Sequence, residues 1–339
     1  MRNRPRKKKS LLILGILALV LSIWYSVTAS QSEYHKTKNT NFTFETIIVN
    51  SPDPERLSDF YRNVFRATKV GSDPKWDLEN SNRSSITLKT PDYKDQGPLL
   101  TIFKGQKENS KLPSANDIGY AHICFEADDI PGLIKQILKN GGKIISSFED
   151  LEKVPAIYGT DPDGTVFEIH LPFPTPFTPL TLYRTLNSLI RIQLKLSPPK
   201  TDSIRFLHVN INSKDWERTL SFYTRVLNTT STGFERNYKG EFIQNLTGIQ
   251  NAEVKGRHII LPGYSAGGPT FEIFTYNQFS SDSPLNKSDT GRVATGFRVL
   301  SLKTAVNKVI QEGGTLISEK ENESAILRDI DGNLFLLAQ

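Results

Sequence analysis

Two histidines and two glutamates in this sequence have side chains that could bind a metal ion or move protons. They are His122, Glu168, His208 and Glu272. Each lies in a short β-rich stretch where polar and apolar side chains alternate, and alternation places residues i and i+2 on one face of a strand. All four therefore point away from the more apolar face of their strands. That position suits ligands lining a concave sheet, and it suits a solvated outer face equally well.

The composition indicates a folded protein without a nucleic-acid partner. The chain has 339 residues, 37% hydrophobic and 23% charged, which is enough for two domains of ordinary size. Its formal net charge of +6 comes from six Lys and Arg residues before residue 10, and the rest of the chain carries 36 basic and 36 acidic residues. Nucleic-acid binding needs a clustered basic face on the folded domain. Cys124 is the only cysteine, which excludes an intrachain disulfide and a cysteine metal cluster.

The N-terminus is predicted to be a targeting or membrane segment. Basic residues precede the apolar run 11–25, as in a signal sequence. With its flanks the run is about long enough to cross a bilayer, which needs roughly 17–25 residues. We predict a hydrophobic helix at 1–30, serving as signal anchor or signal peptide, and a polar tether at 31–41. The expected location is membrane-anchored with extracytoplasmic domains, or secreted or periplasmic if the segment is cleaved.

After residue 41 the chain repeats one plan of strand, helix and further strands. The four modules cover residues 42–105, 118–172, 204–277 and 291–339. Helices of the first and third modules contain Phe-Tyr, those of the second and fourth stop at Gly-Gly, and an Asp-x-Asp-Gly turn precedes the last strand of the second and fourth. We predict one domain at 42–172 and another at 204–339. The Pro-rich linker 173–203 should contain an apolar helix, either packed on a domain or lying on a membrane surface.

These motifs resemble the vicinal oxygen chelate superfamily, which contains glyoxalase I, extradiol dioxygenases, fosfomycin-resistance proteins and bleomycin-binding proteins. The resemblance covers nearly all of residues 42–339. It implies an α+β fold in which four βαβββ modules form two paired domains, in tandem as in glyoxalase I. It does not by itself give a function, because this scaffold hosts both enzymes and plain binding proteins.

The resemblance also implies a ligand set, because metal ligands in that family come from the first and last strands of modules. In the second module these positions hold His122 and Glu168, and in the third they hold His208 and Glu272. In the first and fourth modules the same positions hold Thr46, Thr101, Ala294 and Leu336. The expected cofactor is therefore one divalent ion per chain, either Zn, Ni, Co, Mn or Fe, bound by two imidazoles and two carboxylates.

The resemblance to glyoxalase I implies a metal-dependent lyase or isomerase that acts on a small molecule through a metal-stabilised enolate. Glu168 is the first candidate for the catalytic base and Glu272 the second. The alternative is a small-molecule-binding protein without chemistry, of the bleomycin-resistance type. An extradiol dioxygenase is less favoured, because its His, His, Glu triad would need ligands where Ala294 and Leu336 stand.

The pairing of modules decides whether the four side chains can meet. Adjacent pairing, of one with two and three with four, would divide the ligands between two cavities. Crossed pairing, as in glyoxalase I, joins two with three and one with four and brings all four to one cavity. We predict crossed pairing.

The other histidines and the helix tyrosines are expected to have lesser roles. His170 could line the pocket or orient a substrate. His258 and His35 are predicted to be surface residues outside the ligand positions. Tyr61 and Tyr223 are predicted to pack helix against sheet.

Overall fold

The computed structural model describes residues 41–339 except for residues 80, 82, 92–96, 106–112, 175–176, 199–202, 282–289, 292 and 321. The predicted N-terminal helix at 1–30 and nearly all of the tether lie outside the described residues, so the structure does not support that helix.

The strands and helices follow the predicted module plan. The first module contains β1 (Phe42–Ser51), α2 (Pro54–Phe65), β2 (Thr68–Gly71), the 3₁₀ helix η1 (Pro74–Trp76), β3 (Ser85–Lys89) and β4 (Leu99–Lys104). The second contains β5 (Gly119–Ala127), α3 (Ile130–Lys139), β6 (Lys143–Ile144), β7 (Ala156–Thr160) and β8 (Val166–His170). Helix α4 (Pro179–Gln193) lies in the linker.

The second half of the chain repeats this order. The third module contains β9 (Ile204–Asn212), α5 (Trp216–Leu227), β10 (Ser231–Lys239), α6 (Glu241–Thr247), β11 (Glu253–Ile260) and β12 (Thr270–Tyr276). The fourth contains β13 (Val293–Val299), α7 (Leu302–Gln311), β14 (Thr315–Lys320), β15 (Ser324–Arg328) and β16 (Leu334–Ala338). The third module therefore differs from the plain βαβββ plan by one inserted helix, α6, at the place where the first module has η1.

Local sequence signals set the ends of the module helices. The side chains of the N-cap residues accept a hydrogen bond from the backbone N–H three residues later, which satisfies an amide that the first helical turn leaves unpaired. These caps are Asp53, Asp129, Asp215 and Ser301. After α3 and α7 the chain turns at Gly141 and Gly313, whose φ angles of 87° and 99° favour glycine. The predicted Gly-Gly stops are thus confirmed.

The strands form two eight-stranded sheets, and each sheet combines one module from each half of the chain. Sheet A has the order β14-β15-β16-β13-β1-β4-β3-β2, and sheet B has the order β10-β11-β12-β9-β5-β8-β7-β6. The modules join through antiparallel pairs of first strands, β1 with β13 and β5 with β9. The predicted crossed pairing is therefore confirmed. The halves 42–172 and 204–339 are interleaved, since each contributes to both sheets.

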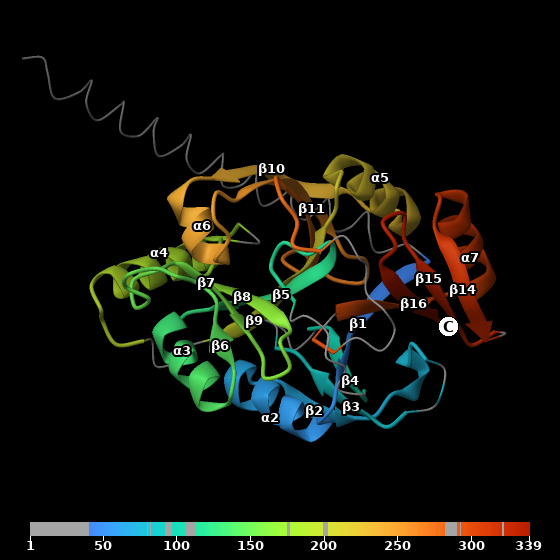
Figure 1. Ribbon diagram of the computed structural model, residues 1–339, viewed down its shortest axis with the longest axis horizontal. Coiled ribbons are helices and arrows are strands. Elements are labelled where there is room, and N and C mark those ends of the chain that lie inside the picture. The colour runs from blue at the N-terminus through green and yellow to red at the C-terminus, as the bar shows by residue number, and fades with distance from the viewer. Residues whose placement is uncertain are drawn as a thin grey trace, which may run out of the picture.

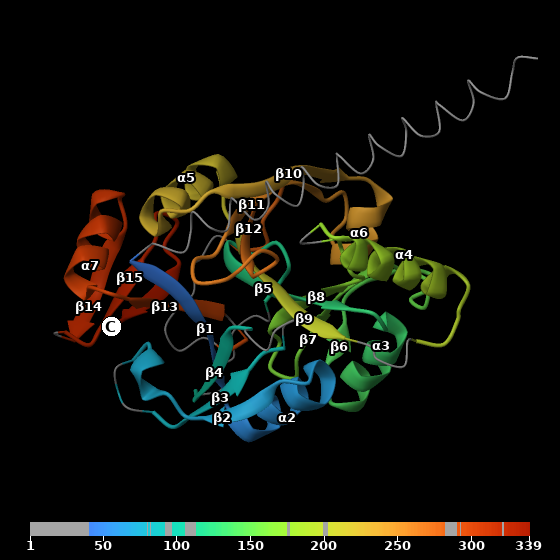
Figure 2. The same cartoon turned by 180° about the vertical axis from the view of Figure 1, so that it is seen from behind.

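The main apolar core lies between the sheets and under the helices. It contains side chains from both sheets, and Phe44 of β1 meets Phe271 of β12 with ring centroids 6.0 Å apart. Helices α2, α3, α5 and α7 lie on the outside of the molecule, as both views show (Figure 1, Figure 2). Because strand side chains alternate, each sheet also has a far face turned away from this core. The far faces carry two smaller buried clusters.

The Phe-Tyr helices and the Asp-x-Asp-Gly turns are joined within each half. Tyr61 on α2 donates a hydrogen bond to Asp161 (2.9 Å), and Tyr223 on α5 donates one to Asp329 (2.7 Å). Both tyrosines are fully buried in the main core. The predicted packing role is confirmed, and the hydroxyls add a link between the modules of one half, which contribute to different sheets.

Helix α4 is fixed to the second module by ion pairs. The Arg184 guanidinium contacts Glu126 at 2.7 Å and Asp128 at 3.0 Å, and Ser188 donates a hydrogen bond to Asp128. Burial by itself would raise the pKa of Glu126, but Arg205 and Arg184 hold it below its usual value. The linker helix therefore packs on a sheet, as one of the two alternatives expected.

No helix among the described residues is long and apolar enough to cross a membrane. The longest of them, α4, has 15 residues and at about 1.5 Å per residue spans about 22 Å. The hydrocarbon core of a bilayer is about 30 Å thick. This finding contradicts the predicted signal anchor, the predicted membrane partner and the predicted extracytoplasmic location.

Candidate metal centre

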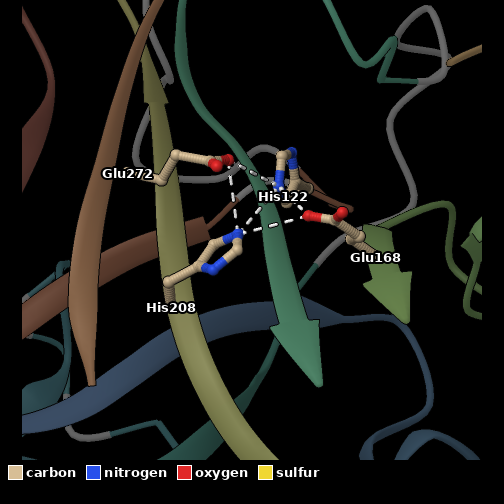
Figure 3. Close-up of side chains that lie close together, drawn as sticks. All are labelled: His122, Glu168, His208 and Glu272. Carbon is tan, nitrogen blue, oxygen red and sulfur yellow. Dashed lines mark hydrogen bonds and ion pairs between the residues drawn. The ribbon is translucent and has the colours of Figure 1, made fainter. Parts of the chain in front are cut away.

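The four candidate ligands come together on the far face of sheet B (Figure 3). Glu272, His208, His122 and Glu168 lie on β12, β9, β5 and β8, which are neighbouring strands in that order. Residues beside them in sequence, including Ile123, belong to the main core. The alternation seen in the sequence thus gave the correct face, and crossed pairing brings the four side chains to one place.

The ligand atoms form a compact group. The Nε2 atoms of His122 and His208 are 3.4 Å apart. Oε2 of Glu168 lies 3.4 Å from His122 Nε2 and 3.3 Å from His208 Nε2. Oε2 of Glu272 lies 3.5 Å and 3.3 Å from the same two atoms. One nitrogen or oxygen atom of each residue therefore faces a common point.

These separations fit a transition-metal ion. Four nitrogen and oxygen donors at about 2.0–2.1 Å from one ion in tetrahedral geometry lie about 3.3–3.4 Å from each other. The donor set of two imidazoles and two carboxylates suits Zn, Ni, Co, Mn or Fe. The residues present therefore fit one divalent ion, although their role as ligands stays a prediction.

Electrostatics in the group favour a positive charge. Burial by itself would raise the pKa of Glu168, but hydrogen bonds from His122 and His208 hold that pKa below its usual value. The pKa of Glu272 is held well below its usual value against burial, chiefly by His208. Burial would lower the pKa of His208, but the carboxylates of Glu272 and Glu168 raise it well above its usual value. The two buried carboxylates are thus ionised and need a cation, either a protonated ring or a metal ion.

Two tyrosines flank the group on the side of α6. Tyr158 on β7 is the cross-strand partner of Glu168, and its hydroxyl lies 3.5 Å from His122 Nε2. The buried hydroxyl of Tyr276 has no hydrogen-bond partner among the described residues. Burial raises the pKa of both phenols, so both remain protonated donors. Sequence reasoning missed these residues, although Tyr276 follows Glu272 by two strand steps on the same face.

His258 lies beside the group, so its prediction as a surface residue was wrong. It stands on β11 directly across from Glu272, and its Nε2 is 3.2 Å from Glu272 Oε1. Its side chain is only 14% exposed, and burial lowers its pKa. The sequence alone could not place it, because β11 becomes a neighbour of β12 only through sheet pairing.

The remaining candidates lie further from the ligand atoms. His170 is buried, and its Nδ1 contacts the backbone oxygen of Leu171 at 2.6 Å while its ring packs on Phe173. Its proposed contact with a substrate stays a prediction. Burial raises the pKa of Cys124, which keeps that thiol protonated. His35 lies outside the described residues.

Strand register confirms which residues of sheet A correspond to the four candidate ligands. In sheet B, His208 pairs across the module junction with Cys124, and Cys124 pairs with Glu168. In sheet A the corresponding chain of partners is Thr46, Gly296 and Leu336. Likewise, in sheet B the strand partners of Asn210 are His122 and Glu272. In sheet A the strand partners of Ile48 are Ala294 and Thr101. The four equivalences expected from the resemblance thus hold at the level of hydrogen-bonded register.

Two sheets, each made of paired βαβββ modules, with two His and two Glu on one far face, are the arrangement that the resemblance to the vicinal oxygen chelate superfamily implied. Residues 43–169 match the family model "Glyoxalase/Bleomycin resistance protein/Dioxygenase superfamily". The resemblance that the sequence motifs predicted is thus confirmed over these residues, which lie in the first half of the chain. No curated protein matches the sequence.

Solved structures of glyoxalase I share this fold over nearly the whole chain. The structure is similar to glyoxalase I from Zea mays, with a TM-score of 0.53, 15% sequence identity, and coverage of 88% of this chain and 92% of that one. A mutant of the same maize enzyme gives a TM-score of 0.56 and 14% identity, with coverage of 91% and 96%. At such identity the likeness concerns the fold, including its tandem organisation.

Proposed function

We propose that this protein is a metal-dependent enzyme of the glyoxalase type, a lyase or isomerase that acts on a small molecule carrying a carbonyl group. The observation that carries the proposal is the convergence of His122, His208, Glu168 and Glu272 on one point, with nitrogen–oxygen separations of 3.3–3.5 Å. A group built only for stability would not need two buried carboxylates beside two imidazoles, since buried charges are costly unless they are compensated.

The residues divide the proposed chemistry between them. A divalent cation held by the four side chains would supply Lewis-acid stabilisation of negative charge on a substrate oxygen. Glu168 is the proposed base, taking a proton from the carbon beside the carbonyl and returning it to a neighbouring atom. Glu272 is the second candidate for this role. The hydroxyls of Tyr158 and Tyr276 are donors that could hold a substrate oxygen.

Proton exchange tests this proposal without requiring knowledge of the natural substrate. The purified full chain is loaded separately with Zn, Ni, Co, Mn or Fe and incubated in D₂O with small α-hydroxycarbonyl compounds. NMR should then show deuterium entering at the carbon beside the carbonyl. Glu168→Gln should slow the exchange by about 10²–10⁴-fold while metal content stays at about one ion per chain.

The possible results separate the proposal from its alternative. Metal binding with no exchange for any compound would favour a binding protein of the bleomycin-resistance type. Exchange that proceeds equally in the Glu168→Gln protein would remove Glu168 from the proposed role. A chain that binds none of the five metals would overturn the metal centre.

A further inference from the structure

The two carboxylates of the proposed centre differ in what holds them. Glu272 has hydrogen-bonding partners at both carboxylate oxygens. Oε2 accepts from Asn210 Nδ2 at 3.2 Å in addition to facing the two ring nitrogens, and Oε1 lies 3.2 Å from His258 Nε2. Glu168 faces the ring nitrogens through Oε2 only, and its Oε1 makes no hydrogen bond within the described part of the chain. Hydrogen-bonding partners therefore constrain the carboxylate of Glu272 at both oxygens, whereas they constrain that of Glu168 at one oxygen only.

Strand pairing places His258 where it can hold Glu272. The two residues are direct partners in the antiparallel pair of β11 and β12. A carboxylate oxygen can only accept, so the His258 ring must donate from Nε2. Nδ1 of the same ring lies 2.9 Å from the hydroxyl of Thr270, which stands two residues before Glu272 on the same strand face. Thr270, His258 and Glu272 therefore form one hydrogen-bonded chain that ends at a proposed ligand.

The ring of His258 also packs beside a second member of the group. Its centroid is 5.3 Å from that of His208, with the planes at 80°. A side chain that contacts one proposed ligand and hydrogen-bonds another restricts the orientations of both. Outer partners of this kind set ligand orientation, and their loss typically lowers metal affinity by about 10–100-fold.

We infer that His258, supported by Thr270, is a positioning residue that holds Glu272 with Oε2 toward the bound ion. Glu168 is then the carboxylate with freedom to exchange hydrogen-bond partners during a reaction. This inference rests on the proposed metal centre and specifies how its two glutamates differ. It assigns a role to a histidine that lies outside the ligand positions.

Cobalt binding to the full-length protein tests the inference through a readout other than activity. Co(II) is titrated into metal-free protein, and its visible absorption reports both affinity and coordination geometry. His258→Phe keeps a ring of similar size but removes the donor. It should bind Co(II) about 10–100-fold more weakly, with an altered visible spectrum. His258→Gln, which restores an N–H donor, should recover most of the affinity.

A matched control comes from the other buried histidine near the group. His170→Phe makes the same chemical change at a ring that hydrogen-bonds only to a backbone oxygen among the described residues, so its Co(II) affinity and spectrum should match the wild type. The thermal midpoints of the metal-free proteins should show that the His258 variants are folded.

Unchanged affinity and spectrum in His258→Phe would overturn the positioning role. So would equal weakening in His258→Phe and His258→Gln, because the donor would then be irrelevant. Failure of the wild type to bind Co(II) would overturn the proposed centre itself, and the inference with it.

Discussion

The far faces of sheets A and B are built on the same strand register but are filled in opposite ways. Sheet B presents two imidazoles and two carboxylates around one point. Sheet A presents Thr46, Thr101, Ala294 and Leu336 at the corresponding positions, all of them fully buried. The hydroxyls of the two threonines hydrogen-bond each other at 2.9 Å, whereas the four side chains in sheet B face a common point. Equivalent backbones therefore support a polar centre in one sheet and an apolar core in the other.

The difference extends to the segments inserted between the second and third strands of the first and third modules. In sheet A the η1 segment brings Trp76 onto the far face, where its fully buried ring lies against Gly296 and packs with Leu336. In sheet B the inserted helix α6 instead contributes Ile243 and Leu246 to a cluster around Tyr158 and Tyr276. The proposed site therefore depends on where the insertion packs as well as on the ligand residues.

The largest expected effect is on metal content, because the bound ion should lie at sheet B alone. The wild-type chain should bind about one divalent ion, since one far face carries the four candidate ligands. His208→Ala should reduce that content clearly below one ion per chain, because it removes an imidazole donor and puts nothing in its place, whereas Gln at position 168 would still offer an oxygen donor. Thr46→Ala, the equivalent change in sheet A, should leave the content unchanged. Elemental analysis of the dialysed proteins measures both, and two tightly bound ions per chain would break the comparison.

Trp76 should be a stability residue without influence on the metal. Trp76→Ala removes a fully buried indole from the far face of sheet A and should lower the free energy of unfolding by about 3–5 kcal/mol. Phe234→Ala, at a side chain 86% exposed, should change it by no more than about 0.5 kcal/mol. Urea unfolding of the metal-free proteins gives both values. If Trp76→Ala also abolished metal binding, the two far faces would be coupled and not independent.

The Asp-x-Asp-Gly turns should behave alike in both halves, in contrast to the far faces. Burial raises the pKa of Asp161 and of Asp329 to about 6, whereas an unfolded Asp has a pKa of about 3.9. A folded-state pKa that is raised favours the protonated form, so this contribution to stability is fully present below about pH 4 and is lost as the pH rises through about 6.

Asn cannot ionise, so the variants isolate this titration. The free energy of unfolding of the wild type should fall between pH 4 and pH 7 as these carboxylates ionise. In Asp161→Asn and in Asp329→Asn this fall should be smaller by about 1–3 kcal/mol each. Urea unfolding at the two pH values measures the difference. A response at one turn only would show that the duplicated halves differ here too, while equal pH dependence in variants and wild type would argue against the raised pKa values.

The smallest effect is expected at the exposed arginines beside these turns. Arg56 pairs with Asp163 and Arg218 with Asp331, and the two arginine side chains are about half exposed. Each pair is open to solvent only on its arginine side, but Ser51 and Thr219 still donate to the two carboxylates when the arginine is removed. Arg56→Ala and Arg218→Ala should therefore each lower the free energy of unfolding by less than about 1 kcal/mol. The loss should shrink further in high salt. A loss of several kcal/mol at either site would mean that the buried carboxylate depends on its arginine and that the hydroxyl donors cannot replace it.

The sequence by itself determined the modules, their order and the chemistry that each strand carries. Helix caps such as Asp53, glycine stops such as Gly141 and the Asp-Gly turns act over a few residues, so they can be recognised without a tertiary structure. Strand alternation likewise fixed the face on which His122 and Glu272 lie. The N-terminal apolar run led the same kind of reasoning to a membrane anchor, which the described helices do not support.

Only the tertiary structure decided which strands became neighbours, because strand pairing joins segments far apart in the chain. The antiparallel pair of β5 and β9 brought together two candidate ligands, His122 and His208, that are 86 residues apart. The same pairing logic put His258 beside Glu272 and Tyr158 beside Glu168, although neither residue stands at a ligand position. Trp76 entered the far face of sheet A from an insertion whose path no local signal specified. Side-chain type and face are local properties, whereas adjacency across a sheet depends on the whole strand order.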